Sequence, residues 1–129
     1  RPGHSIEETV NTANLHARQR TGIVLLGMGD DGHTASLFPH MRGLDDALAS
    51  LSDYVAVDAT GCPGAGPWLR RISLTPAGLG IAHTRLLLLR GQGKREVFER
   101  ALAGDDPREM PVRISFMTPG AQLQVHWCP

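Results

Sequence analysis

Residues 23–33 read IVLLGMGDDGH, and this stretch decides the fold. Its first four residues are continuously apolar and branched, and Gly22 and Gly27 bound them. Runs of this kind are typical of a strand that is buried on both faces of a parallel sheet. The rest of the stretch therefore predicts a glycine-rich loop directly after a buried strand.

Segments typical of helices and strands alternate along the rest of the chain. Ser5 and Glu8 have the spacing of a capping box, which predicts a helix from there to about Arg20. Further strands are predicted at 54–57, 71–74, 86–89 and 123–127, the last as an edge strand, and helices at 76–82 and 94–103. This alternation predicts an α/β fold with an open, mostly parallel sheet flanked by helices.

The composition of the chain is that of one globular domain. It has 129 residues with 13 basic and 13 acidic side chains, and the balanced charge argues against a nucleic-acid partner. No apolar run approaches the roughly 20 residues of a membrane helix, so no membrane association is expected. Cys62 and Cys128 fit a reducing compartment, which favours a cytoplasmic location. The His and Cys residues lack the spacing of zinc ligands, so we expect no metal.

The loop after the first strand carries the residues that are suited to chemistry. In open parallel sheets, ligands bind beyond the carboxyl ends of the strands. Gly27, Gly29 and Gly32 let the backbone turn tightly and approach a ligand closely. Asp31 and His33 stand two residues apart, and a carboxylate beside an imidazole fixes its tautomer. This pair predicts general acid–base catalysis near neutral pH.

The same glycines also form a GxGxxG pattern, which raises a dinucleotide site as an alternative. Asp58 ends a predicted strand near the position where a ribose-binding acid would stand. Asp30 and Asp31, however, would place negative charge beside the pyrophosphate. A helix after the loop would be interrupted at Pro39 and again near Gly43. The dinucleotide interpretation is therefore not favoured.

The sequence LGMGDDGHTASLFP at 26–39 resembles the signature of the 6-phosphogluconolactonase family. Downstream, RISLT at 71–75 is similar to that family's arginine-led strand, and GQGK at 91–94 to its strand-to-helix turn with a lysine. The resemblance implies a Rossmann-like sheet, as in the related sugar-phosphate isomerases. It implies hydrolysis of a phosphorylated sugar lactone, 6-phosphogluconolactone, in the oxidative pentose phosphate pathway, with no obligatory cofactor.

The resemblance also implies roles for individual residues. His33 would be the general base and Asp31 the residue that orients it, while the turn of Gly27, Gly29 and Gly32 would approach the substrate. Arg71 and Lys94 would bind the phosphate. The simpler alternatives are a structural histidine, a capping aspartate and two solvated cations.

The positions of Arg71 and Lys94 in the sequence support their assignment to the phosphate. Adjacent strand residues face opposite sides, so only one of Arg70 and Arg71 can face the site, and the family pattern selects Arg71. Lys94 opens a helix after two glycines, where free amides and a cation suit a phosphate.

Family members are considerably longer and carry another glycine-rich turn in their N-terminal part. No such turn precedes Gly22, and the chain does not begin with Met. We therefore expect residues 1–129 to form a single α/β domain that is the C-terminal portion of a larger one. Missing strands would leave an open edge beside 23–26, which favours self-association.

Two alternative functions stay open at this point. One is a glucosamine-6-phosphate deaminase-like enzyme, whose family shares the DGH element. Phe38 stands here where the catalytic glutamate of that family would stand, which weighs against it. The other is a non-catalytic sugar-phosphate binding module, which would keep Arg71 and Lys94 but lack turnover.

Overall fold

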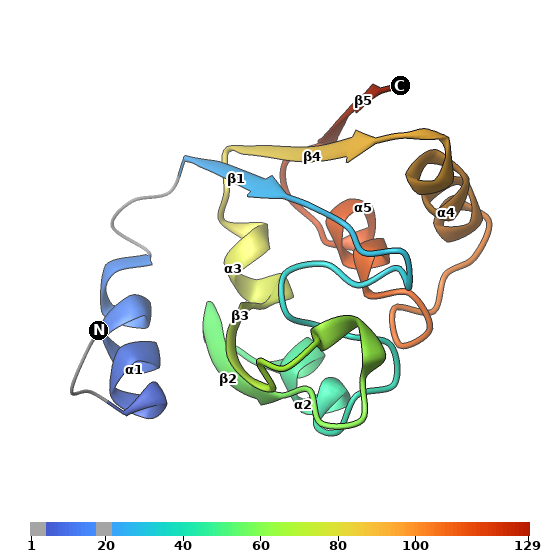
Figure 1. The fold of residues 1–129 in the computed structure, drawn as a ribbon. Helices are drawn as coiled ribbons and strands as arrows, with labels where there is room; N and C mark the ends of the chain where they lie inside the picture. The colour runs from blue at the N-terminus through green and yellow to red at the C-terminus, as the bar shows by residue number, and fades with distance from the viewer. Residues whose placement is uncertain (1–4, 18–21) are drawn as a thin grey trace.

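A computed structural model describes residues 5–17 and 22–129 of the chain (Figure 1). Short helices, 3₁₀ turns and strands follow one another as the alternating pattern predicts. In chain order they are α1 Ile6–Ala17, β1 Ile23–Leu26, α2 Leu44–Ala49, β2 Tyr54–Asp58, η1 Pro63–Ala65, β3 Arg70–Leu74, α3 Pro76–Gly80, β4 Thr84–Arg90, α4 Gln92–Leu102, η2 Pro111–Arg113, α5 Ile114–Met117 and β5 Leu123–Cys128.

Three strands form a parallel sheet in the order β1-β4-β5. Leu26 of β1 lies opposite Leu87 of β4, and Leu87 lies opposite Val125 of β5. The predicted α/β class with a parallel sheet is confirmed, and the segment predicted as an edge strand is the edge strand β5. The strand β1 lies at the other edge.

The prediction that the first strand is buried on both faces is wrong. Leu26 is 6% exposed, whereas Ile23 and Leu25 are 69% and 61% exposed. Figure 1 shows α3, α4 and α5 on one side of the sheet, and no described helix covers the other side. The run is apolar on both faces, but only one face meets a packing partner within residues 5–17 and 22–129.

The segments predicted as strands at 54–57 and 71–74 do not join this sheet. They form β2 and β3, an antiparallel pair in which Tyr54 lies opposite Leu74 and Asp58 opposite Arg70. The loop 59–69 between them contains only a 3₁₀ turn. Two parallel neighbours need a longer crossover, usually a helix, so this connection can only return the chain in the antiparallel direction.

The N-terminal capping box is confirmed. The N–H of Glu8 donates to Oγ of Ser5 at 3.1 Å, and the N–H of Ser5 donates to Oε2 of Glu8 at 3.4 Å. The helix is described to Ala17, and its predicted end at Arg20 lies outside the described residues. The amide of Asn14 bonds both the N–H and the carbonyl of Tyr54, so α1 lies along the edge of β2.

The predicted helices at 76–82 and 94–103 correspond to α3 and α4. The sequence does not predict α2, η2 or α5, which are short and have no clear periodicity. Within the part of the chain that is described, no helix has both the length and the apolar character needed to cross a bilayer. The core lies between the sheet, the helices below it and the segment that follows β1, where Leu37, Phe38, Leu79 and Leu87 are fully buried.

Candidate active site

The loop 27–33 leaves β1 at the carboxyl edge of the parallel sheet. Its backbone closes on itself, because the N–H of Gly29 donates to the carbonyl of His33 at 2.9 Å and the N–H of Gly32 to that of Gly29 at 3.0 Å. Gly32 has a φ of 85°, in the left-handed region that favours glycine. The hydroxyl of fully buried Thr34 donates to the carbonyl of Gly27 at 2.7 Å. The loop is therefore held in one shape by its own groups.

Asp31 and His33 form a direct pair in this loop. Oδ1 of Asp31 lies 2.6 Å from Nδ1 of His33 and also accepts from the His33 N–H at 3.0 Å. An ionised carboxylate can only accept, so Nδ1 carries a proton, and in the neutral imidazole Nε2 then keeps its lone pair. No group among residues 5–17 and 22–129 bonds Nε2, and the His33 side chain is 22% exposed. The pair thus leaves Nε2 without a partner among the described residues, on a side chain that solvent partly reaches.

A stack of side chains supports the His33 imidazole. The ring of fully buried Phe38 lies 4.3 Å from it, centroid to centroid, with a tilt of 35°. The guanidinium of Arg71 lies 5.2 Å from the centroid of Phe38. Neighbouring Arg70 instead pairs with Glu7 of α1 at 3.0 Å. Arg71 therefore faces the site and Arg70 faces away from it, as strand alternation predicts.

Arg71 also holds the loop between β2 and β3. Its Nε donates to the carbonyl of Trp68 at 2.7 Å and its Nη2 to that of Ala65 at 2.6 Å. Within the described chain, Nη1 has no acceptor, so this nitrogen is available to a ligand. The side chain has a structural role that sequence alone does not reveal.

Lys94 links α4 to the loop. Its Nζ donates to the carbonyl of Met28 at 2.8 Å and lies 3.2 Å from Oδ1 of Asp30. The Asp30 carboxylate is 88% exposed, so this ion pair is weakened by solvent. An anionic ligand at Lys94 would have to compete with Asp30.

The backbone amides of the loop divide into two groups. Those of Gly29 and Gly32 are already used within the loop. Those of Asp30 and Asp31 have no acceptor among the residues described. The donors open to a ligand therefore include the amides of Asp30 and Asp31.

The 3₁₀ turn η1 lies against the Asp31 carboxylate. A Cβ built on Gly64 would come 2.5 Å from Oδ2 of Asp31. Burial raises the pKa of the Cys62 thiol, and the charges of Asp31 and Asp58 raise it further. No sequence signal indicates this contact, because η1 and the loop 27–33 meet only through the tertiary fold.

The structure does not support a dinucleotide site at the GxGxxG pattern. The loop continues into turns and a bridge between Thr34 and Leu37, so no helix begins behind it. Asp58 lies on the separate hairpin, where its carboxylate accepts from the N–H and the hydroxyl of Thr60 at 2.9 and 2.6 Å. These two bonds are the main reason that the pKa of Asp58 is lowered.

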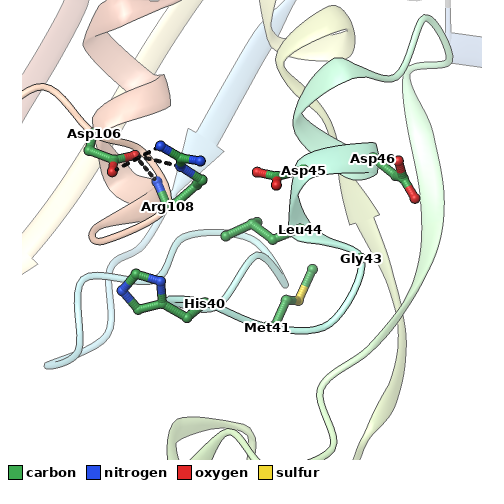
Figure 2. Close-up of a pocket in the computed structure, with 8 residues that line it drawn as sticks. All are labelled: His40, Met41, Gly43, Leu44, Asp45, Asp46, Asp106 and Arg108. Carbon is green, nitrogen blue, oxygen red and sulfur yellow. Dashed lines mark hydrogen bonds and ion pairs between the residues drawn. The ribbon is translucent and has the colours of Figure 1, made fainter.

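A hollow of about 700 Å³ lies elsewhere on the surface, between α2 and the segment before η2 (Figure 2). Arg108, which lines it, is paired with Asp106 at 3.1 Å. The hydrogen bond from the Arg108 N–H, and then the one from its guanidinium, lower the pKa of Asp106. None of the site residues predicted from the sequence lines this hollow. Among the described residues, no group of three or more His, Cys, Asp or Glu side chains is placed to hold a metal ion.

Comparison with known proteins gives consistent similarities. The family model described as glucosamine-6-phosphate isomerases/6-phosphogluconolactonase matches residues 4–127. A 6-phosphogluconolactonase of Xylella fastidiosa strain Temecula1 is 51% identical over 130 residues, which cover 99% of this chain and 54% of that protein. A 6-phosphogluconolactonase of Pseudomonas aeruginosa is 38% identical over 137 residues, which cover 99% of this chain and 52% of that protein.

Solved structures show the same similarity. The crystal structure of a 6-phosphogluconolactonase from Shewanella baltica has a TM-score of 0.80 and 30% identity, covering 94% of this chain and 49% of that one. The chain spans about half the length of the curated relatives it matches.

Proposed function

Because the chain belongs to the family of glucosamine-6-phosphate isomerases and 6-phosphogluconolactonases, we propose that it is the C-terminal portion of a 6-phosphogluconolactonase. The reaction is the hydrolysis of 6-phospho-D-glucono-1,5-lactone to 6-phospho-D-gluconate. The observation that carries the proposal is the 2.6 Å contact between Asp31 Oδ1 and His33 Nδ1, which leaves Nε2 as a base at the edge of the sheet.

In the proposed mechanism, His33 acts first as a base and then as an acid. Nε2 takes a proton from a water molecule while the water oxygen bonds to the lactone carbonyl carbon. Asp31 stabilises the imidazolium and holds its orientation, and the free amides of Asp30 and Asp31 would donate to the oxyanion. Collapse of the intermediate breaks the bond between that carbon and the ring oxygen, which receives the proton from His33.

In this proposal two cations hold the phosphate, and the turn of the loop lies against the lactone. Arg71 offers Nη1, and Lys94 exchanges its exposed partner Asp30 for the phosphate. The turn of Gly27, Gly29 and Gly32 lets the backbone lie close to the lactone. These groups position the ring and do not need to touch the reacting carbon.

We place this reaction in the oxidative pentose phosphate pathway and in the cytoplasm. Cys62 and Cys128 are both free thiols, which supports a reducing compartment. The partner is the small-molecule phosphorylated lactone. The balanced charge argues against a nucleic-acid partner. No cofactor is needed for this chemistry, because a lactone is already an activated ester.

The deaminase-like alternative has little support at the site. Phe38, at the position of that family's catalytic glutamate, has no ionisable group, and it is fully buried against His33. A binding module without turnover would not need the Asp31–His33 pair.

The test is His33→Asn in a version of the protein extended at its N-terminus. Asn keeps a similar size but cannot accept a proton near neutral pH, so turnover should fall by roughly 10² to 10⁴. Lactone hydrolysis is measured and corrected for the spontaneous reaction. A rate near that of the unchanged protein would refute the assignment of His33 as the base.

A further inference from the structure

The imidazole of His33 occupies the space where a side chain at position 29 would lie. A Cβ built on Gly29 would overlap Cε1 and Nδ1 of His33 and come 2.7 Å from Oδ1 of Asp31. Both atoms of the Asp31–His33 hydrogen bond are therefore packed directly against the Gly29 backbone. No real Cβ tolerates such distances, so any other residue here would force the pair apart.

Backbone conformation does not explain the glycine at this position. Gly29 lies outside the left-handed region, so alanine could adopt its φ. Its N–H donates to the carbonyl of His33, and any other non-proline residue would keep that bond. What glycine supplies here is room for the imidazole. Gly22 and Gly27 differ in this respect, because a Cβ at either would meet nothing within 4 Å.

Phe38 and the turn at Gly64 flank the Asp31–His33 pair. Phe38 is fully buried against the imidazole ring and cannot retreat. On the side of Asp31, the turn at Gly64 lies beside Oδ2, where a Cβ on that glycine would come to 2.5 Å. A methyl group at position 29 would therefore push the imidazole outward to solvent and break its bond to Asp31.

We propose that Gly29 is a positioning residue that keeps His33 bonded to Asp31. The inference rests on the proposed function, since it explains how the base of that reaction is oriented. Gly29 acts through His33 and does not need to touch the substrate. Its role is distinct from the substrate-approach role that the glycine pattern alone predicts.

The first experiment uses the N-terminally extended protein and needs no turnover. Nitrogen and proton NMR of the histidine rings is recorded for Gly29→Ala and for the matched control Gly22→Ala, with the His33 signals assigned by their loss in His33→Asn. Gly29→Ala should lose the strongly hydrogen-bonded Nδ1 proton of His33 and mix its tautomers. Gly22→Ala should keep both signatures. Retention of the bonded proton in Gly29→Ala would overturn the proposal.

A thermodynamic cycle covers the case in which Gly29→Ala folds poorly. His33→Ala removes the ring that the new methyl group would meet. Gly29→Ala should therefore lower the unfolding midpoint much more when His33 is present than in the His33→Ala background, where the methyl group still approaches Oδ1 of Asp31. An equal loss in both backgrounds would show that the methyl group clashes elsewhere, which contradicts the proposal.

Turnover in the N-terminally extended protein separates this inference from the proposed function. Gly29→Ala should lower kcat by about a hundredfold, with KM nearly unchanged, because the base is misplaced and the phosphate contacts are not. Full kcat in Gly29→Ala, beside an inactive His33→Asn, would overturn the positioning role alone. Activity retained in His33→Asn would instead refute the proposed function, while the NMR result would still decide the geometry.

Discussion

At the scale of single residues, the charge of Asp31 acts on Cys62 as well as on His33. Burial raises the pKa of the Cys62 thiol, and Asp31 raises it further. Because the thiolate is the reactive form, Asp31→Asn should lower this pKa and speed alkylation of Cys62 at about pH 8. The rate is measured in a Cys128→Ser background, since Cys128 is exposed.

Asp30→Asn is the matched control for this measurement. Asp30 is not among the groups that shift the Cys62 pKa, and its carboxylate points to Lys94. Equal rates in the Asp31→Asn and unchanged proteins would mean that η1 does not lie beside Asp31.

The two cations proposed for the phosphate can be compared directly. Arg71→Ala and Lys94→Ala should each raise KM for the phosphorylated lactone by roughly ten- to a hundredfold, because each loses a charge-assisted bond. Arg71→Ala should cost more, since Arg71 also holds Ala65 and Trp68. The measurement uses phosphorylated and unphosphorylated lactone side by side. If KM rises equally for both substrates, these residues do not recognise the phosphate.

The contacts of Asp31 and His33 could be predicted from the sequence, because the two residues are close neighbours on one loop. The contacts that Phe38 and Gly64 make with this pair could not be predicted. Phe38 reaches His33 through the turns at 34–37, and Gly64 reaches Asp31 from a different hairpin. Such contacts depend on how distant segments pack, and no local pattern encodes them.

At the scale of elements, a buried arginine closes the end of α4. Nε of Arg113 donates to the carbonyl of Ala101 at 2.9 Å, and Nη1 to that of Asp106 at 2.9 Å. Gly104 leaves room for it, because a Cβ there would overlap the guanidinium. The glycine after this helix is therefore required by close packing and not by a left-handed backbone.

Arg113→Met should destabilise the chain by about 3 kcal/mol, because helix-end carbonyls lose their charged donor while the volume is nearly kept. The change is measured as the shift in the urea midpoint. Arg100→Met, on the exposed side of the same helix, should change stability by no more than about 0.5 kcal/mol. Similar shifts for both variants would contradict the structural role of Arg113.

The identity of most elements follows from local signals, whereas their pairing does not. The Ser5–Glu8 capping box and the alternating residues of β5 are local patterns, and both predictions are confirmed. Whether Tyr54–Asp58 enters the parallel sheet or pairs with Arg70–Leu74 depends on what the loop between them can span. An apolar run likewise does not show which of its faces finds a partner.

At the scale of the whole molecule, the described chain has a sheet with one bare apolar face. Ile23, Leu25 and Leu88 share that face through the β1–β4 register, and all three are exposed. The opposite face packs on helices (Figure 1). Burying such a surface is favourable, and β1 also has unpaired backbone groups along its free edge. If the chain is a C-terminal portion, as proposed, an N-terminal portion would cover this face.

The 129-residue chain should therefore self-associate and catalyse poorly. A version extended at its N-terminus should self-associate less and be active. The site here has His33, Asp31, Arg71 and Lys94 but not the second glycine-rich turn that the family resemblance implies, and misplacement of the lactone can cost about a hundredfold. Sedimentation and corrected lactone hydrolysis measure the two properties. Leu25→Lys should reduce self-association of the short chain, whereas Leu51→Lys, at an exposed leucine outside the sheet, should not. A monomeric short chain with full activity would show that the site is complete without further residues.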